Sequence, residues 1–246
     1  MEERIQKVLS RVGLASRRQV DRWLQEGRLR INQRQAKPGD RMGPHDRVYL
    51  DNRLLKIRVQ QDPVPRVLLL NKPTGTICSR KDPEHQSSVY RLLPKIRSQR
   101  WVMVGRLDLN TSGLLLFTNH GELAHRLMHP SSNLRRGYQV RVFGEPDDAV
   151  LERLATGVEL EDGMARFDKI IPIQKEHGRN QWFYVEVSQG RHRMVRRLWG
   201  SQDIQVSRLI RVQYGPLSFS RHIPPGRYEE LSPGQVNALL RQMKLA

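Results

Sequence analysis

Two stretches near the start of the chain carry apolar residues three and four positions apart, the spacing that brings side chains to one face of an α-helix. They are Ile5, Val8, Leu9 and Val12 in the first stretch and Val20, Trp23 and Leu24 in the second. Ser16 is a suitable N-cap for the second helix, and Gly27 is a suitable residue just past its end. The pattern therefore predicts a pair of short helices.

Shorter apolar runs follow the two helices. They predict strands over 29–32 and 46–50, with a turn at Asn32 and Gln33. The result is a small helix–helix–hairpin module that closes by about residue 60. The segment 58–65 contains two prolines and is typical of a linker. We therefore expect one domain over 1–60 and a second over 61–246.

The second part of the chain alternates irregularly between strand and helix patterns. Strands are predicted over 67–70, 101–104, 114–117, 138–143, 165–173, 182–187 and 206–214, and helices over 89–93, 121–128, 147–155 and 191–199 and after the N-cap pair Ser232 and Pro233. No repeated strand–helix–strand pattern is visible. The fold class indicated is α+β, with a mixed, mostly antiparallel sheet flanked by helices.

Composition adds a strong preference for an anionic partner. The formal net charge is +18, and both the first 60 residues and the remainder carry a basic excess. Hydrophobic residues make up 37% of the chain, which is enough for a real core. A charge of this size favours nucleic acid as the partner, with an anionic membrane surface as a distant second.

The sequence also restricts the compartment. Cys78 is the single cysteine, which excludes an internal disulfide and a cysteine-based zinc site. The charged start MEERIQKVLSRVG lacks the apolar core of a signal peptide, and the apolar runs are too short to cross a bilayer. We expect a cytoplasmic protein that does not enter a membrane.

The segment GRLDLNTSGLLLFT, over 105–118, contains the strongest candidate for chemistry. Asp108 lies between Leu107 and Leu109 and directly precedes an apolar strand. A carboxylate in such a setting is costly to bury without a cation. An acid held in this way is a candidate nucleophile or acid–base group, although most aspartates in turns are ordinary surface residues.

Two sources of a partner cation for Asp108 remain open. Arg106 is one, although residues two apart point the same way only in an extended chain. The predicted helix over 191–199 is the other, because Arg193, Arg196 and Arg197 lie near one face of it. At least one of these arginines is expected to be a solvated, phosphate-binding residue instead.

Aromatic and histidine residues offer further candidates. Tyr138 begins a strand whose face is otherwise valine; such a tyrosine is usually a core residue, and alternatively its ring could stack on a base. His120, His125 and His129 lie near Glu122 but match no zinc motif, so we expect helix-surface histidines and no metal. A glycosidase would need two placed carboxylates, and only one is set off by its context.

The segment over 105–130 resembles the signature of the bacterial pseudouridine synthases of the RsuA/RluB group. NKPTG over 71–75, YQV over 138–140, RHRMVRRL over 191–198 and SRLIRVQYG over 207–215 resemble the other blocks of that family, in the same order. Residues 4–33 resemble an S4 (αL-type) RNA-binding domain, although this stretch ends in Gln33 where a glycine is usual. The resemblance covers nearly the whole chain and implies an S4 domain followed by a pseudouridine synthase domain.

The resemblance implies roles for individual residues. Asp108 corresponds to the essential aspartate, which acts as nucleophile or general base. Arg106 corresponds to the arginine that occupies the space of the flipped nucleotide, and Tyr138 to the tyrosine that packs on the target base. Arg196 corresponds to the basic residue that pairs with the aspartate, and Leu209 to an apolar residue of the pocket wall.

RNA contacts are implied for four more arginines. Arg17 and Arg18 match positions where the S4 helix pair presents cations, and Arg193 and Arg197 belong to the basic helix. The implied activity is the isomerisation of uridine to pseudouridine in ribosomal RNA, free or in a precursor subunit, by a monomer that uses no metal or organic cofactor. The 23S RNA of the large subunit is the expected substrate. The alternatives are 16S RNA, or a non-catalytic S4-type assembly factor.

Overall fold

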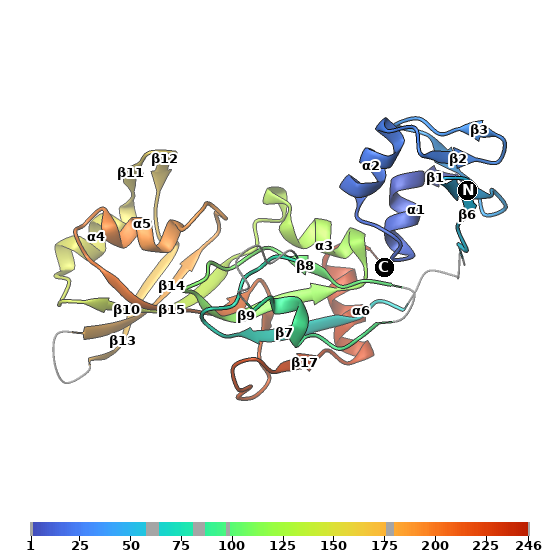
Figure 1. Cartoon of the computed structure of the whole chain (residues 1–246). Helices are drawn as coiled ribbons and strands as arrows, with labels where there is room; N and C mark the ends of the chain where they lie inside the picture. Colours follow the sequence, from blue (N-terminus) through green and yellow to red (C-terminus); the bar gives the residue numbers. More distant parts are fainter. Residues whose placement is uncertain (1, 58–63, 81–86, 97–98, 176–179, 246) are drawn as a thin grey trace. The chain divides into compact units, whose positions relative to one another are not determined.

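The computed structural model describes residues 2–57, 64–80, 87–96, 99–175 and 180–245. It divides into two compact units (Figure 1). The first unit contains residues 1–66 with the short segments 94–102 and 118–121, and the second contains the remainder of the chain. Most of the expected linker, residues 58–63, lies outside the described residues, so the domain boundary at residue 60 stays a prediction.

The first unit contains a helix pair and two small antiparallel sheets. Its elements are β1 (Glu3–Arg4), α1 (Ile5–Arg11), α2 (Arg17–Gln25), β2 (Leu29–Ile31), β3 (Arg34–Gln35), β4 (Arg41–Met42), β5 (Val48–Leu50) and β6 (Arg53–Leu54). The strands pair in the order β3-β2-β5-β6 and, separately, β1-β4. The predicted helical stripes point inward, because Ile5, Val8 and Leu9 of α1 and Val20 and Leu24 of α2 form one buried cluster with the sheet.

The second unit is built on a nine-stranded sheet. Its elements are β7 (Val67–Lys72), the 3₁₀ helix η1 (Val89–Leu92), β8 (Val102–Val104), β9 (Ser112–Thr118), α3 (Gly121–Met128), η2 (Pro130–Ser132), β10 (Arg136–Phe143), α4 (Asp148–Thr156), β11 (Val158–Leu160), β12 (Gly163–Ala165), β13 (Lys169–Lys175), β14 (Asn180–Val187), α5 (Met194–Gly200), β15 (Val206–Tyr214), β16 (Leu217–Ser218), β17 (Tyr228–Glu230) and α6 (Pro233–Gln242). The α+β class expected from the pattern is confirmed.

The sheet runs β13-β14-β10-β15-β9-β7-β17, with β16 beside β15 and β8 beside β9. The pairs β10–β14, β10–β15, β13–β14 and β7–β17 are antiparallel, whereas β9 and β15 are parallel. β11 and β12 form a separate hairpin. The parallel pair matters for function because it brings the start of β9, just after Asp108, beside the middle of β15.

The two faces of β13, β14, β10 and β15 differ sharply. Val140, Phe183, Val185 and Leu209 share one face, where they form a buried cluster with residues of α4 and α5. Figure 1 shows both helices on this side of the strands. The alternation of apolar residues along β10, noted in the sequence, therefore records a sheet covered by helices on one face only.

Local signals account for several helix ends. The Ser16 side chain accepts a hydrogen bond from the Gln19 N–H, and Gly27 has a φ of +67° just past α2. Asp147 caps α4 in the same way through the Val150 N–H. Ser232 and Gln235 form a complete capping box at the start of α6. These helix starts and the stop at Gly27 agree with the sequence-based prediction.

Three predicted elements needed correction. The strand expected over 165–173 is divided, because Ala165 ends β12, Phe167 is buried between the two strands, and β13 starts only at Lys169. The strand expected over 46–50 begins at Val48, since the Asp46 carboxylate accepts hydrogen bonds from the Gly43 N–H and the Asn32 amide in a turn. The helix expected over 191–199 begins at Met194.

Candidate active site

Asp108 lies in the loop between β8 and β9. Its side chain is half-buried, Leu107 before it is buried, and Leu109 and Asn110 after it are exposed. The backbone turns sharply here, since the Thr111 N–H donates to the Asp108 carbonyl at 3.1 Å. The partial burial predicted from the apolar neighbours is therefore observed, and the loop must be held from outside to keep the carboxylate in place.

Lys72 is the main anchor of this loop. Its side chain is fully buried at the end of β7, and its ammonium donates to the carbonyls of Pro73 and Thr111 at 2.9 Å each and of Leu109 at 3.4 Å. Burial lowers the pKa of Lys72, and attraction to Cys78 and Asp108 opposes that shift. Sequence reasoning noted the block NKPTG but gave Lys72 no role, because a lysine is seldom fully buried.

Two further contacts hold the same loop from the segment that follows β7. The Gly75 N–H donates to the Leu109 carbonyl at 3.0 Å, and Gly75 has a φ of +76°, which favours glycine. The Leu107 N–H donates to the Cys78 Sγ at 3.4 Å. Burial raises the pKa of the Cys78 thiol, which favours its neutral form. Cys78 therefore serves as a packed acceptor beneath the loop.

Arg196, on α5, holds the loop from its other side. Its Nη2 donates to the Asn110 carbonyl at 3.0 Å and its Nη1 to the Val206 carbonyl at 2.9 Å. Burial and the nearby Arg193 lower the pKa of Arg196, while attraction to Asp108 opposes them. Within the described part of the chain, Asp108 forms no ion pair of 4 Å or less. The predicted cation is thus near the carboxylate, but its hydrogen bonds go to backbone carbonyls.

Tyr138 and Leu209 lie on the sheet face that α5 covers. Tyr138 packs partly buried against the cluster that contains Leu209, Val195 and Trp199. Leu209 is 6% exposed and precedes Ile210, which is the register partner of Ser112 at the start of β9. The face with Tyr138 and Leu209 is therefore continuous, through the β9–β15 pair, with the end of the Asp108 loop.

The close approach of β9 and β15 depends on a glycine. A Cβ atom on Gly113 would lie 2.2 Å from the Arg211 carbonyl oxygen, so no side chain fits there. Arg211 itself is 2% exposed, and its Nε donates to the Leu114 carbonyl at 2.7 Å. Its guanidinium also lies 5.1 Å from the Tyr214 ring centroid. Arg211 is a second buried cation that sequence reasoning did not single out.

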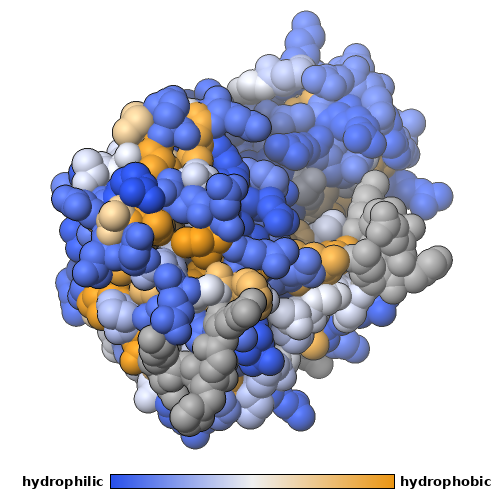
Figure 2. Space-filling model, turned by 90° about the vertical axis from the view of Figure 1, so that its left-hand side faces the viewer, coloured by the Kyte–Doolittle hydropathy of each residue, from blue (hydrophilic) through white to orange (hydrophobic). Residues whose placement is uncertain are grey.

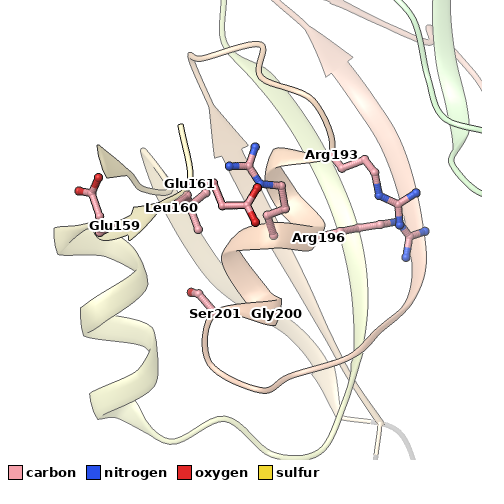
Figure 3. A pocket seen from close by; sticks show the side chains of 8 residues that line it. Glu159, Leu160, Glu161, Arg193, Arg196, Gly200 and Ser201 are labelled. Atoms are coloured by element: carbon pink, nitrogen blue, oxygen red, sulfur yellow. The ribbon is translucent and has the colours of Figure 1, made fainter. Parts of the chain in front are cut away.

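Arg106 and Arg193 are both exposed. Arg106 follows Gly105, which has a φ of +70°, and it is close enough to Cys78 to attract its thiolate form. Arg193 is the N-cap of α5 and has a left-handed backbone with a φ of 49°. It is therefore the residue that caps the helix, although its carbonyl still accepts the hydrogen bond of the Arg197 N–H at 3.0 Å. Figure 3 shows the Arg193 and Arg196 side chains extending to the same side of α5.

Arg197 has an intramolecular partner. Its Nη1 donates to Asp162 Oδ2 at 3.0 Å, and its Nη2 contacts the other carboxylate oxygen. Arg191 approaches the same carboxylate at 3.3 Å and donates to the Gly163 carbonyl at 2.7 Å. These contacts fasten the β11–β12 hairpin to α5. They give Arg197 a structural task in addition to the RNA contact predicted for it.

A depression of about 500 Å³ lies between β11 and α5 (Figure 3). It is lined by Glu159, Leu160, Glu161, Arg193, Arg196, Arg197, Gly200 and Ser201. Because it shares Arg196 with the Asp108 loop, it belongs to the surroundings of the same site. Its mixed charges do not define a ligand by themselves.

The remaining candidates belong to other elements of the chain. Arg17 and Arg18 are exposed in the first turn of α2, where positive charge is unfavourable to the helix dipole. His125 and His129 lie 5.3 Å apart between ring centroids, and His129 caps η2. The described residues contain no group of three side chains suited to hold a metal ion. None of their helices is long and apolar enough to span a membrane.

The Asp108 loop thus holds a half-buried carboxylate near an arginine from a separate helix and near a sheet with a partly buried tyrosine. Residues 66–200 match the family described as RNA pseudouridylate synthase, and residues 3–48 match the S4 domain. The chain therefore belongs to the RNA pseudouridylate synthase family and carries an S4 domain before the catalytic region.

Three curated relatives called "Ribosomal large subunit pseudouridine synthase B" are similar along nearly the whole chain. The Pseudomonas aeruginosa protein is 46% identical, and the match covers 99% of this chain and 63% of the relative. The Haemophilus influenzae protein is 48% identical, and the match covers 96% of this chain and 67% of the relative. The Escherichia coli K12 protein is 47% identical, and the match covers 100% of this chain and 84% of the relative. The chain thus spans less than two thirds of the P. aeruginosa relative. The resemblance noted in the sequence is confirmed.

A crystal structure of a pseudouridylate synthase has a similar fold. It superposes with a TM-score of 0.65 over 96% of this chain and 99% of its own, at 23% sequence identity. At that identity the likeness concerns the fold alone.

Proposed function

We propose that this protein isomerises a uridine of 23S ribosomal RNA, in the large ribosomal subunit, to pseudouridine. The observation that carries the proposal is the anchored loop that holds the half-buried Asp108 close to Arg196 and Lys72. Family membership supports the reaction, and the names of the relatives support the large subunit.

The reaction needs few protein groups. The N1–C1′ bond of uridine breaks, the uracil turns, and C5 joins C1′. C5 then loses its proton and N1 gains one, with no net redox or hydrolytic change. Asp108 supplies the carboxylate, as nucleophile or base. Its neighbours Lys72 and Arg196 are close enough to attract the Asp108 carboxylate electrostatically. No step in this account requires a metal or an organic cofactor.

The target uridine must leave its stack, which costs a few kcal/mol and less if it is already unpaired. We assign Arg106, exposed beside Asp108, to the space that the uridine vacates. Tyr138 packs on the turned-out base, with Leu209 in the wall behind it. Arg17 and Arg18 of the S4 domain and Arg193 at α5 contact phosphates. We infer a cytoplasmic monomer that acts on free RNA or on a precursor subunit.

Mapping of pseudouridines in ribosomal RNA tests the proposal. A strain that lacks the protein should lose one pseudouridine of 23S RNA, wild type should restore it, and Asp108→Asn should not. Asp108→Asn should retain the wild-type melting temperature, because the described residues give its carboxylate no ion pair to lose. Restoration by Asp108→Asn would refute the catalytic assignment.

The same map separates the alternatives. A pseudouridine lost from 16S RNA would assign the protein to the small subunit. An unchanged map would favour an S4-type assembly factor without catalysis. Release of free uracil from RNA in vitro would indicate an N-glycosidase.

A further inference from the structure

The sheet has an uncovered aromatic face on the side opposite α4 and α5. β14 alternates, so that Phe183 and Val185 are buried under the helices while Trp182 and Tyr184 point to the other side. Among the described helices, none covers this side of β13, β14, β10 and β15 (Figure 1). Ile171, the register partner of Tyr184, is 41% exposed. We call the side of the sheet that carries Trp182 and Tyr184, together with Arg141, Arg208 and Lys169, the open face.

The Tyr184 side chain reaches over the backbone of β10. A Cβ atom on Gly137, in β10, would lie 2.5 Å from the Tyr184 hydroxyl and 3.0 Å from its Cζ. The hydroxyl reaches across β10 to Gln213 of β15, at 2.7 Å from its Oε1, and lies 3.0 Å from Glu186 Oε1. Because Gly137 has no side chain, the ring can lie directly over its backbone. The hydroxyl end of the ring therefore lies close to the sheet, on the side that the helices do not cover.

Trp182 lies two residues before Tyr184 on the same face of the strand. Side chains two apart on a strand are separated by about 7 Å, a spacing suited to successive bases of an extended single strand. Phe143, at the end of β10, is on the same side and is 52% exposed. Aromatic residues on an open sheet are a common means of stacking bases of single-stranded RNA.

The cations around these rings match a polyanion. Arg141 and Arg208 are direct cross-strand partners on the open face, and like charges placed opposite each other destabilise a sheet. Arg141 also lies 6.0 Å from the Trp182 ring centroid, and Lys169 lies 6.0 Å from that of Tyr184. The acidic Glu186 is nearly buried and approaches Arg135 at 3.5 Å. A phosphate between Arg141 and Arg208 would relieve their repulsion.

We propose that the open face binds a single-stranded segment of RNA, with bases stacked on Trp182 and Tyr184 and phosphates near Arg141, Arg208 and Lys169. This surface lies on the opposite side of the sheet from Tyr138 and Leu209, so it holds RNA away from the reacting uridine. The proposal rests on the proposed RNA substrate and adds a second contact to it. Figure 2 faces the side of the second unit where these strands lie, and apolar residues are interspersed with hydrophilic ones there.

Equilibrium binding of a fluorescein-labelled octa-adenylate to the full chain tests the proposal. This probe contains no uridine and so cannot react at Asp108. Trp182→Leu and Tyr184→Leu should each weaken binding by about fivefold to a hundredfold, the range for loss of one base–aromatic stack. Tyr184→Phe keeps the ring and should retain the wild-type affinity. Tyr228→Leu, which removes an exposed aromatic residue from β17, is the matched control and should have no effect.

Gly137→Ala gives an independent test, because it lifts the ring without removing it and should weaken octa-adenylate binding as Tyr184→Leu does. Melting temperature and isomerisation of a short uridine-bearing hairpin by Trp182→Leu should both stay at wild-type levels. This separates the open face from catalysis, which Asp108→Asn tests. If Trp182→Leu and Tyr184→Leu bind the octa-adenylate as Tyr228→Leu does, the proposal is wrong. The proposal is also wrong if the Trp182→Leu and Tyr184→Leu variants impair only the binding of a ribosomal protein.

Discussion

The guanidinium of Arg196 donates a hydrogen bond of 3.0 Å to the carbonyl oxygen of Asn110, two residues after Asp108. A second hydrogen bond, to the Val206 carbonyl, ties the same guanidinium to the first residue of β15. Arg196 therefore connects α5, β15 and the loop of the candidate catalytic acid. The positive charge of Arg196 attracts Asp108 electrostatically, whereas its hydrogen bond to Asn110 holds the backbone of the loop. Substitutions can separate these two effects.

Arg196→Met should abolish most activity, because it removes both the nearby cation and the donor to Asn110. We expect a loss of at least about a hundredfold in kcat/KM, since a misplaced catalytic group of this kind costs that much. Arg196→Lys keeps the cation but cannot bridge two carbonyls in the same planar geometry, so it should retain part of the activity. Single-turnover isomerisation of a ribosomal RNA fragment measures both. Equal activity of the Met and Lys variants would contradict a role for the charge.

Lys72→Met should loosen the Asp108 loop. The substitution leaves the carbonyls of Pro73, Leu109 and Thr111 without their buried donor, which we expect to cost about 1–3 kcal/mol in the free energy of unfolding. Thermal melting measures the stability, and single-turnover kinetics should show a lower rate of chemistry in the folded variant. Lys95→Met, at an exposed lysine, is the control and should change neither. A Lys72→Met protein with wild-type melting and rate would contradict the anchoring role.

Tyr138→Phe distinguishes the ring from the hydroxyl. The ring packs against the cluster that contains Leu209, so the phenylalanine variant should fold and bind RNA like the wild type. If the hydroxyl takes part in proton transfer at C5, the single-turnover rate should fall while the dissociation constant stays the same. Tyr138→Leu, which removes the ring, should lower the single-turnover rate and also weaken the binding of RNA. An unchanged rate in Tyr138→Phe would assign Tyr138 to stacking alone.

The sequence predicted the elements whose signals are local. The Ser16 cap and Gly27 bounded α2, the alternation along Tyr138, Val140 and Val142 identified β10, and Ser232 marked the start of α6. Each of these depends on neighbours within a few positions. The pattern of apolar residues also predicted that Asp108 precedes a buried strand, and β9 is buried in the structure.

Features that depend on distant partners could not be predicted. The β11–β12 hairpin is held by contacts between Asp162 and Arg197, thirty-five positions away. Lys72 is buried only because the chain returns, at Thr111, with carbonyls for its ammonium to bind. The left-handed backbone at Arg193 has no local signal, since arginine does not favour it. A sequence pattern contains the residues of such contacts but not their pairing.

The titration of Tyr184 should reveal how its hydroxyl is held. Burial, followed by the hydrogen bond to Glu186, raises the pKa of Tyr184 to about 12, from an ordinary value of 10.0. Below pH 10 both folded and unfolded chains keep the proton, so the contribution of the neutral hydroxyl to stability is fully present. As pH rises from 10 towards 12 the unfolded chain loses the proton first, and the contribution is lost. The stability of wild type relative to Tyr184→Phe should therefore fall across this window.

Tyrosinate absorbance of the folded protein, compared with that of Tyr184→Phe, gives the pKa directly. Glu186→Gln should lower the pKa of Tyr184, because it removes the carboxylate that favours the protonated hydroxyl. Tyr228→Phe removes an exposed tyrosine and is the control for ordinary titration. Ionisation of Tyr184 near pH 10 in the folded wild type would contradict the arrangement in which its hydroxyl is held between Glu186 and Gln213.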